Sequence, residues 1–316
     1  MAAPPLTGIH HLTAVSADVR GNRAFYEGVL GLRLVKRTVN QDDPGAYHLF
    51  YADALGSPGT DITFFEWPLP PERRGAHSVT RTAFRVGDGD VLAAWERRLS
   101  AAGVETAPFE GGERPEIRFE DPEGQRLAIV VDGGAGDEPA VWESSLVPAA
   151  EQLRGLGPIT MTVADLDRTR PTLERLMGMT EERVYDDAGT SVHVFAMAGG
   201  GAHAELHVAV DPSQRPARLG AGAVHHVAFR TPDDDAYHAW TERLSEFRIH
   251  HSGEVDRFWF RSLYFREPSG VLFEIATDGP GFTVDEDAEH LGETLVLAPF
   301  LEPQRAAIAA RLTPLG

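Results

Sequence analysis

The chain has 316 residues, of which 29 are Lys or Arg and 48 are Asp or Glu, so its formal net charge is −19 at neutral pH. This charge excludes a nucleic-acid binder that works by neutralising phosphates, because no basic excess exists to displace counterions. The sequence has no cysteine, which excludes disulfides and thiolate chemistry, so any metal has to be held by nitrogen and oxygen.

The N-terminal segment, residues 1–10, has neither a basic region nor an apolar run, so it does not read as a signal peptide. No uninterrupted apolar run approaches the roughly 20 residues that span a bilayer. We therefore expect a soluble, cytoplasmic protein with neither a membrane nor a nucleic acid as partner. An acidic surface says nothing about self-association, so formation of a homo-oligomer stays open.

One pattern recurs four times along the chain: a short strand, an amphipathic helix, then several strands that end in an apolar one. The copies cover residues 8–67, 79–131, 157–210 and 222–276. A stretch rich in Gly, Pro and charge begins at residue 132, between copies two and three, and places a boundary near residue 148.

These repeats predict an α+β fold of four βαβββ modules in two tandem domains, each an open curved mixed sheet with flanking helices. The domains are expected over residues 1–148 and 149–316. The repeat pattern stops after residue 276, and the acidic tail beyond it is expected to pack across a domain.

Two histidine pairs occupy the same position in the first strands of copies one and four, His10-His11 and His225-His226. Adjacent strand residues point to opposite faces, so only one histidine of each pair can face a given cavity. The alternate positions that include His225 continue with apolar residues, which would meet the helices. Those that include His226 continue with Ala and Arg, so we assign His226 and His11 to the polar interior of a curved sheet.

The last strand of copy four supplies a third ligand. Phe273 and Ile275 share the helix-facing side of this strand, which leaves Glu274 on the inner face. A buried carboxylate there is costly unless it is ionised against a cation. Two histidines and one carboxylate suit iron(II) with open positions for substrate and oxygen. The sequence therefore predicts one metal site, formed by His11, His226 and Glu274.

A rival ligand set lies on the last strand of copy three, where His203, Glu205 and His207 alternate. An edge strand with a wetted polar face produces the same pattern, and no histidine column supports this set. The glycine run at 199–201 joins two strands, which favours a hairpin turn over a phosphate-binding loop.

Two further polar side chains precede Glu274 on a neighbouring strand. Arg257 offers a fixed cation for an anionic substrate or peroxide, and Tyr264 offers a hydroxyl that can donate or accept a hydrogen bond. The alternative for Arg257 is a surface guanidinium paired with an acidic residue.

Over almost its whole length the chain resembles the vicinal-oxygen-chelate superfamily, which has the glyoxalase and extradiol dioxygenase fold. Within it the chain is most similar to hydroquinone ring-cleaving dioxygenases of the chlorohydroquinone and methylhydroquinone 1,2-dioxygenase type. The motifs that carry the resemblance lie at residues 8–13, 25–42, 47–53, 56–60, 225–226, 256–257, 262–268, 273–278 and 299–305.

The resemblance implies iron(II) held by His11, His226 and Glu274, in agreement with the strand alternation. It also implies supporting roles in catalysis for five residues. Strand alternation instead sends two of them, His10 and His225, away from the metal, and a β-bulge or a role in holding the neighbouring ligand strand would reconcile the two views. The five residues are His10, Thr13, His225, Arg257 and Tyr264.

The implied reaction is cleavage of a substituted hydroquinone, or a related diphenol, between a hydroxylated carbon and its neighbour. The expected partners are therefore a small aromatic diol and O2. Three alternatives share the fold: a catechol-type extradiol dioxygenase, a glyoxalase-like isomerase or lyase that uses zinc, nickel or manganese, and a metal-free protein that binds a small aromatic molecule.

Overall fold

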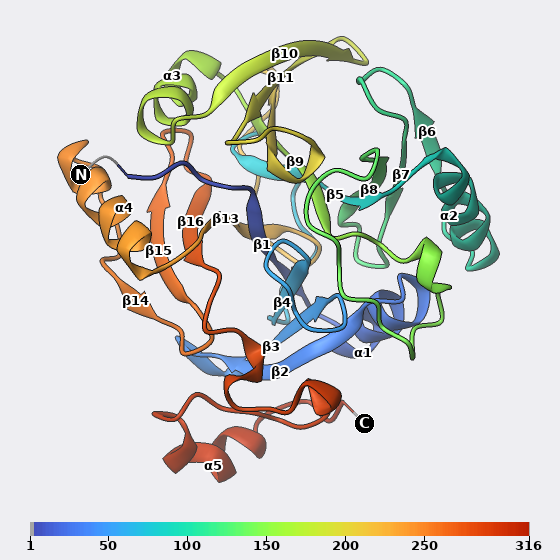
Figure 1. The fold of residues 1–316 in the computed structure, drawn as a ribbon, viewed down its shortest axis with the longest axis vertical. Coiled ribbons are helices and arrows are strands. Elements are labelled where there is room, and N and C mark those ends of the chain that lie inside the picture. The colour runs from blue at the N-terminus through green and yellow to red at the C-terminus, as the bar shows by residue number, and fades with distance from the viewer. Residues whose placement is uncertain (1–2, 316) are drawn as a thin grey trace.

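A computed structural model describes residues 3–315 of the chain. The described residues form four successive βαβββ modules, which confirms the predicted α+β class and the four repeats (Figure 1). Their strands, β1 to β16, build two curved mixed sheets of 8 strands each. None of the helices in residues 3–315 combines the length and apolar composition that a bilayer crossing demands.

Each sheet combines one module from either side of the predicted boundary at residue 148. The first sheet has the order β14-β15-β16-β13-β1-β4-β3-β2 and so joins modules one and four. The second has the order β10-β11-β12-β9-β5-β8-β7-β6 and joins modules two and three. The two halves of the sequence therefore do not each fold into a sheet of their own, and the boundary itself stays a prediction.

The first sheet brings the two ends of the repeat region together, because β1 and β13 pair antiparallel at its centre. Its strands are β1 (Ile9–Ser16), β2 (Arg33–Asn40), β3 (Asp43–Ala52), β4 (Asp61–Glu66), β13 (Val224–Thr231), β14 (Val255–Asp256), β15 (Arg261–Arg266) and β16 (Leu272–Thr277).

The second sheet has the same plan, with β5 and β9 antiparallel at its centre. Its strands are β5 (Ser78–Val86), β6 (Ala107–Phe109), β7 (Glu116–Glu120), β8 (Arg126–Val131), β9 (Leu156–Val163), β10 (Thr180–Asp187), β11 (Thr190–Ala196) and β12 (Glu205–Val210).

One helix per module packs against a sheet. In α2 the side chain of Asp88 caps the first turn by accepting hydrogen bonds from two backbone N–H groups, and Leu92, Trp95 and Leu99 form one buried stripe against β7 and β8. The helices are α1 (Val19–Arg23), continued by a π-helical turn (Ala24–Val29), α2 (Gly89–Ala101), α3 (Leu166–Pro171), continued by a π-helical turn (Thr172–Leu176), α4 (Asp234–Glu246) and α5 (Arg305–Ala309).

The C-terminal segment, residues 278–315, runs along the β2 and β3 side of the first sheet and carries α5 at the bottom of the view (Figure 1). Leu295 bridges Arg37 of β2, and Gly292 crosses so closely that a Cβ there would lie 1.9 Å from the Leu34 carbonyl oxygen. The predicted packing of the tail across a domain therefore takes place on the first sheet.

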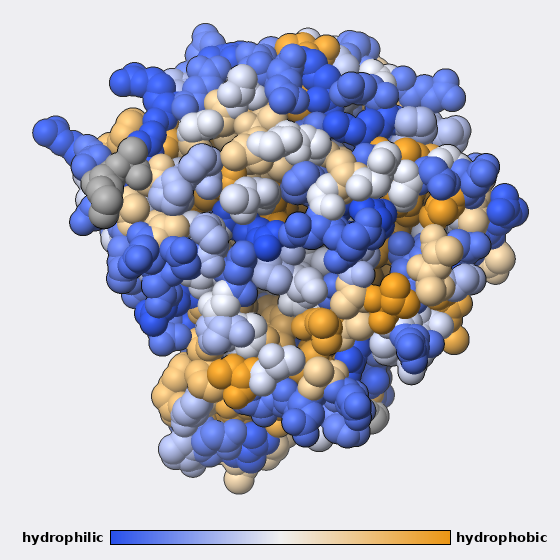
Figure 2. Space-filling view, viewed as in Figure 1, coloured by the Kyte–Doolittle hydropathy of each residue, from blue (hydrophilic) through white to orange (hydrophobic). Residues whose placement is uncertain are grey.

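The outer surface in Figure 2 is hydrophilic over most of its area, and its apolar residues form small groups. The main apolar core lies where helices meet the sheets and includes residues of both. A second, smaller apolar cluster lies on the inner face of the first sheet and reaches the C-terminal segment. It contains Val35, Phe50, Ala52, Ala228, Trp259, Phe260, Ala276, Phe282, Leu291 and Ala298.

Candidate metal centre

Three buried side chains from three strands converge inside the first sheet: His11 on β1, His226 on β13 and Glu274 on β16. One ligand atom of each lies within 4.8 Å of the others. The Glu274 Oε2 atom is 2.9 Å from His226 Nε2 and 3.3 Å from His11 Nε2, and the two Nε2 atoms are 3.4 Å apart. The structure thus brings the predicted ligands to a common point.

Strand pairing explains this convergence. β13 lies between β1 and β16, antiparallel to the first and parallel to the second. Within this register Thr13 faces His226, and Ala228 faces Glu274, so the ligand positions lie on neighbouring rungs of adjacent strands. Residues 11 and 226 meet only because the sheet joins modules one and four.

The chemistry of the donor set fits a divalent cation. Glu274 is fully buried, and its Oε1 atom accepts a hydrogen bond of 2.5 Å from the Ser262 hydroxyl. Its Oε2 atom accepts no hydrogen bond, although it faces the two imidazoles. Burial tends to raise the pKa of this carboxyl, but the imidazole of His11 and that of His226 outweigh burial and hold the pKa well below its usual range. A buried carboxylate oxygen without a donor is costly unless a cation satisfies it.

His10 and His225 support the ligands through β-bulges. In the pairing of β1 with β13 each of these residues is the extra one in its strand. The bulges turn both rings toward their neighbours, so that His10 Nδ1 lies 2.9 Å from His11 Nδ1, and His225 Nδ1 lies 2.8 Å from His226 Nδ1. The bulge expected to reconcile strand alternation with a supporting role is thus present at both positions, and each ring contacts the ligand ring that follows it.

The two supporting histidines differ in their second contact. His10 Nε2 lies 3.0 Å from the Thr277 carbonyl oxygen and so links His11 to the end of β16. His225 makes no second hydrogen bond within residues 3–315. Burial lowers the pKa of each supporting imidazole to about 3, which leaves both rings neutral.

Arg257 and Tyr264 line the same pocket as the two ligand histidines. The Arg257 guanidinium lies 5.3 Å from the centre of the Tyr264 ring, and it donates a hydrogen bond of 2.8 Å to Asp42. Arg257 therefore pairs with an acidic residue, as the alternative of a surface guanidinium predicted, and it also lines the pocket. Burial and the Glu274 carboxylate raise the pKa of Tyr264, although Arg257 opposes them. The raised pKa keeps the Tyr264 hydroxyl protonated.

Thr13 is fully buried and does not line the pocket. Its hydroxyl lies 2.7 Å from the hydroxyl of Thr63 on β4, and Thr63 in turn lies 2.8 Å from His48 Nε2. His48, on β3, does line the pocket and is not among the residues predicted from the sequence. The only available signal was the motif at 47–53, because the pocket-facing side of β3 depends on how that strand pairs.

The pocket is lined by aromatic side chains together with a few polar ones. Such a lining suits a planar ring oriented by polar groups. The lining residues are His11, Val39, Asn40, Gln41, Asp42, His48, Phe50, Phe65, His226, Arg257, Trp259, Phe260 and Tyr264.

The wall formed by residues 256–260 is held from two sides. Phe258 has a positive φ of 74°, and the Gln41 side chain donates a hydrogen bond of 2.8 Å to the Arg257 carbonyl. On the other side the Trp259 indole donates to Asp285 of the C-terminal segment at 3.0 Å. Asp285 also pairs at 2.9 Å with Lys36, a fully buried lysine that contacts Glu286 as well.

In the second sheet, the carboxylate of the rival ligand set already pairs with cationic side chains of the protein. Glu205 accepts hydrogen bonds from Arg114 at 3.0 Å and from Arg183 at 2.7 Å, and it lies 2.9 Å from His207 Nε2. His203 lies in a short helical turn before β12 and does not join them. Within residues 3–315 the set formed by His11, His226 and Glu274 is the one group whose ligand atoms meet at metal-binding distances.

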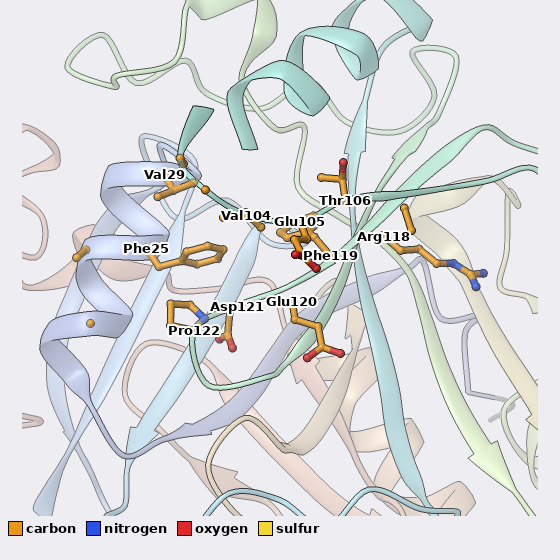
Figure 3. Close-up of a pocket in the computed structure, with 15 residues that line it drawn as sticks. Phe25, Val29, Val104, Glu105, Thr106, Arg118, Phe119, Glu120, Asp121 and Pro122 are labelled. Carbon is orange, nitrogen blue, oxygen red and sulfur yellow. The ribbon is translucent and has the colours of Figure 1, made fainter. Parts of the chain in front are cut away.

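A wider hollow lies outside both sheets, between the first helix, the end of α2 and β7 (Figure 3). Its lining includes Phe25, Val29 and Phe119, with Asp121 and Glu120 at one side, and it contains no histidine. Size alone therefore does not identify the chemical site.

A sequence profile of the Glyoxalase/Bleomycin resistance protein/Dioxygenase superfamily matches residues 8–129 and 155–275. The chain is 40% identical to "Putative ring-cleaving dioxygenase MhqA" of Bacillus subtilis, over 98% of this chain and 99% of that protein. It is 32% identical to "Chlorohydroquinone/hydroquinone 1,2-dioxygenase" of Sphingobium indicum, over 93% of this chain and 92% of that protein.

Solved structures of similar fold include a dioxygenase-like protein and a glyoxalase. A crystal structure of a putative dioxygenase from Bacillus subtilis superimposes with a TM-score of 0.90 at 36% identity and covers 99% of both chains. Glyoxalase I from Zea mays, at 16% identity and a TM-score of 0.61, shares the fold over 86% of this chain and 92% of its own. The chain belongs to the glyoxalase/bleomycin resistance protein/dioxygenase superfamily. Within it, the chain is a member of the ring-cleaving dioxygenase family of its sequence relatives.

Proposed function

We propose that the protein is an iron(II)-dependent dioxygenase that uses O2 to open the ring of hydroquinone or a substituted hydroquinone. The observation that carries this proposal is the meeting of His11, His226 and Glu274 in a buried pocket with aromatic walls. Two imidazoles and one carboxylate are the ligand set of non-haem iron(II) oxygenases, which leave positions open for other molecules. The name of the Sphingobium relative supports a hydroquinone as the substrate class.

Iron(II) held by these three side chains would act as a Lewis acid toward a substrate oxygen and pass electron density from the substrate, which is oxidised, to O2. The reaction inserts both atoms of O2 and breaks the bond between a hydroxylated ring carbon and its neighbour. The chain's own residues bind the ring between aromatic walls, exclude water and hold the ligands in orientation through His10 and His225.

Arg257, which precedes β15, and Tyr264, on β15, supply a charge and a proton at the pocket. The Arg257 guanidinium stabilises negative charge that develops on oxygen atoms near the ligands, since it stays charged at any working pH. The Tyr264 hydroxyl, protonated and beside Arg257, is placed to donate a proton or a hydrogen bond to the same atoms. His10 and His225, both neutral, keep the ligand imidazoles in one tautomer.

The test is anaerobic purification, metal analysis, and O2 uptake with hydroquinone and with catechol. We expect about one iron per chain and uptake that favours hydroquinone. Preference for catechol would replace the substrate class with that of a catechol-type dioxygenase. Zinc, nickel or manganese without O2 uptake would indicate a glyoxalase-like isomerase or lyase, and absence of any tightly held metal would indicate a binding protein.

A further inference from the structure

His48 faces the metal-site pocket but has no role in the function proposed above. It lies on β3, beyond β4, and its ring packs between two phenylalanines, 4.0 Å from the centre of Phe50 and 4.4 Å from the centre of Phe65. The Phe65 ring lies 6.4 Å from that of His226. The Phe65 ring is therefore a neighbour of both His48 and a metal ligand, and His48 lines the same pocket as that ligand.

A chain of hydroxyls fixes the protonation of the His48 ring. Thr13 contacts Thr63, and Thr63 contacts His48 Nε2. Both threonines are fully buried, and neither hydroxyl has a further partner in residues 3–315. Three assignments of the protons are therefore possible, and they differ in how many buried hydroxyl protons lack an acceptor.

Only one assignment leaves no hydroxyl proton without an acceptor. In it Thr13 donates to Thr63, and Thr63 donates to His48 Nε2, so the ring proton sits on Nδ1. If Nε2 carried the proton instead, one of the two buried hydroxyls would donate to nothing, which costs more than an unused oxygen lone pair. His48 thus has an N–H group at Nδ1, which makes no hydrogen bond to any described residue. Burial lowers the pKa of His48 well below its usual value, so the ring carries this single proton.

We propose that His48 is a specificity-determining residue that donates a hydrogen bond from Nδ1 to the substrate hydroxyl farthest from the metal ligands. The inference rests on the proposed function and specifies its substrate as a para-diol. In a para-diol the two oxygens lie at opposite ends of the ring, so one can reach the ligand atoms while the other reaches His48. In an ortho-diol both oxygens lie at the same end, and His48 has no partner.

This arrangement also gives Thr13 a function. Because Thr13 is buried behind Thr63 and does not line the pocket, it acts as a positioning residue that orients the Thr63 hydroxyl. Through Thr63 it selects the His48 tautomer whose proton points toward substrate. Loss of either hydroxyl frees the ring to adopt the other tautomer, in which Nδ1 is an acceptor.

The experiment measures binding of hydroquinone and of phenol to the iron-loaded protein by anaerobic calorimetry, alongside O2 uptake. Phenol lacks the distal oxygen, so it reports on everything except the proposed hydrogen bond. We expect His48→Phe, which keeps an aromatic ring between Phe50 and Phe65, to weaken hydroquinone binding about tenfold and to leave phenol binding unchanged. His48→Gln, whose amide can donate, should recover part of the loss, and Thr63→Val should show an intermediate loss confined to hydroquinone.

The matched control is His290→Phe, at an exposed position of the C-terminal segment, which should bind both ligands as the wild type does. Unchanged hydroquinone binding in His48→Phe, or equal losses for hydroquinone and phenol, would overturn the inference while wild-type O2 uptake with hydroquinone still supported the proposed function. Wild-type O2 uptake with catechol and none with hydroquinone would overturn both. Iron content and the thermal unfolding midpoint of each variant show whether a loss comes from misfolding.

Discussion

His10 and His11 are adjacent on β1, and their Nδ1 atoms lie only 2.9 Å apart. Regular strand geometry would point them in opposite directions, and a β-bulge at His10 removes that restriction. A second β-bulge lies at His225 on β13. Each ligand imidazole is thus held by the residue that precedes it.

Replacement of a ligand histidine should abolish metal retention. We expect His226→Ala to lose iron during purification and to show no O2 uptake, because two remaining ligands cannot hold the ion in competition with water. The measurement is iron content by elemental analysis together with an oxygen electrode. His238→Ala, at an exposed position on α4, is the control. Full activity in His226→Ala would reject the site.

Glu274→Gln should weaken metal binding while it keeps the shape of the site. Glutamine can keep the contact with Ser262 but lacks the negative charge that a divalent cation would neutralise. Added iron(II) at about 100 times its Kd should stabilise the wild type by about 2.7 kcal/mol and the variant by much less. Thermal unfolding with and without metal under anaerobic conditions tests this. An equal response of both proteins to iron would contradict a ligand role for Glu274.

The two supporting histidines should contribute unequally. His10→Phe is expected to lower iron affinity by about 10- to 100-fold, because His10 ties His11 to the Thr277 carbonyl. His225→Phe should cost less, since His225 lacks a comparable anchor among the described residues. Competition with a chelator measures both affinities. A larger loss for His225→Phe would show that the carbonyl anchor is unimportant.

The buried lysine should matter for the C-terminal segment. Lys36→Met leaves Asp285 and Glu286 without their cation in a mostly buried site, so we expect a loss of about 3 kcal/mol in the free energy of unfolding. The exposed pair of Arg305 and Glu302 provides a comparison, and Arg305→Met should cost about 0.5 kcal/mol or less. Urea unfolding of both variants measures the difference, and equal losses would contradict this reasoning.

Asp121 should make stability depend on pH. Burial raises the pKa of Asp121 from 3.8 to about 6, against the opposing effect of hydrogen bonds from the backbone of Gln125 and Glu123 and from the Tyr26 hydroxyl. Between these two pH values the unfolded chain is ionised at this residue while the folded chain still holds the proton. The contribution of Asp121 to stability therefore falls as pH rises from about 4 to about 6, and stays low above that.

Asp121→Asn should remove this dependence. We expect the variant to gain about 1–2 kcal/mol over the wild type at pH 7 and nothing below pH 4, because the asparagine oxygen can still accept the backbone hydrogen bonds. Urea unfolding across this range of pH provides the measurement. A constant difference between the two proteins at every pH would contradict the shifted pKa.

The sequence by itself determined the fourfold repeat and the three side chains that can bind a metal. Periodicity is local information, so four modules could be read from the chain, and alternation along single strands put His11, His226 and Glu274 on inner faces. The absence of cysteine and the composition of the three side chains limited the metal chemistry before any strand was paired.

Only the tertiary structure decided which modules share a sheet, where the bulges fall and what encloses the pocket. The pairing of β1 with β13 depends on contacts across more than 200 residues of sequence, and no local pattern specifies them. A bulge inserts one residue and interrupts the alternation, so alternation alone could not decide how His10 and His225 lie relative to the metal ligands. His48 and Lys36 acquire their surroundings from β4 and from the C-terminal segment, so their places follow from packing between distant parts of the chain rather than from the residues beside them.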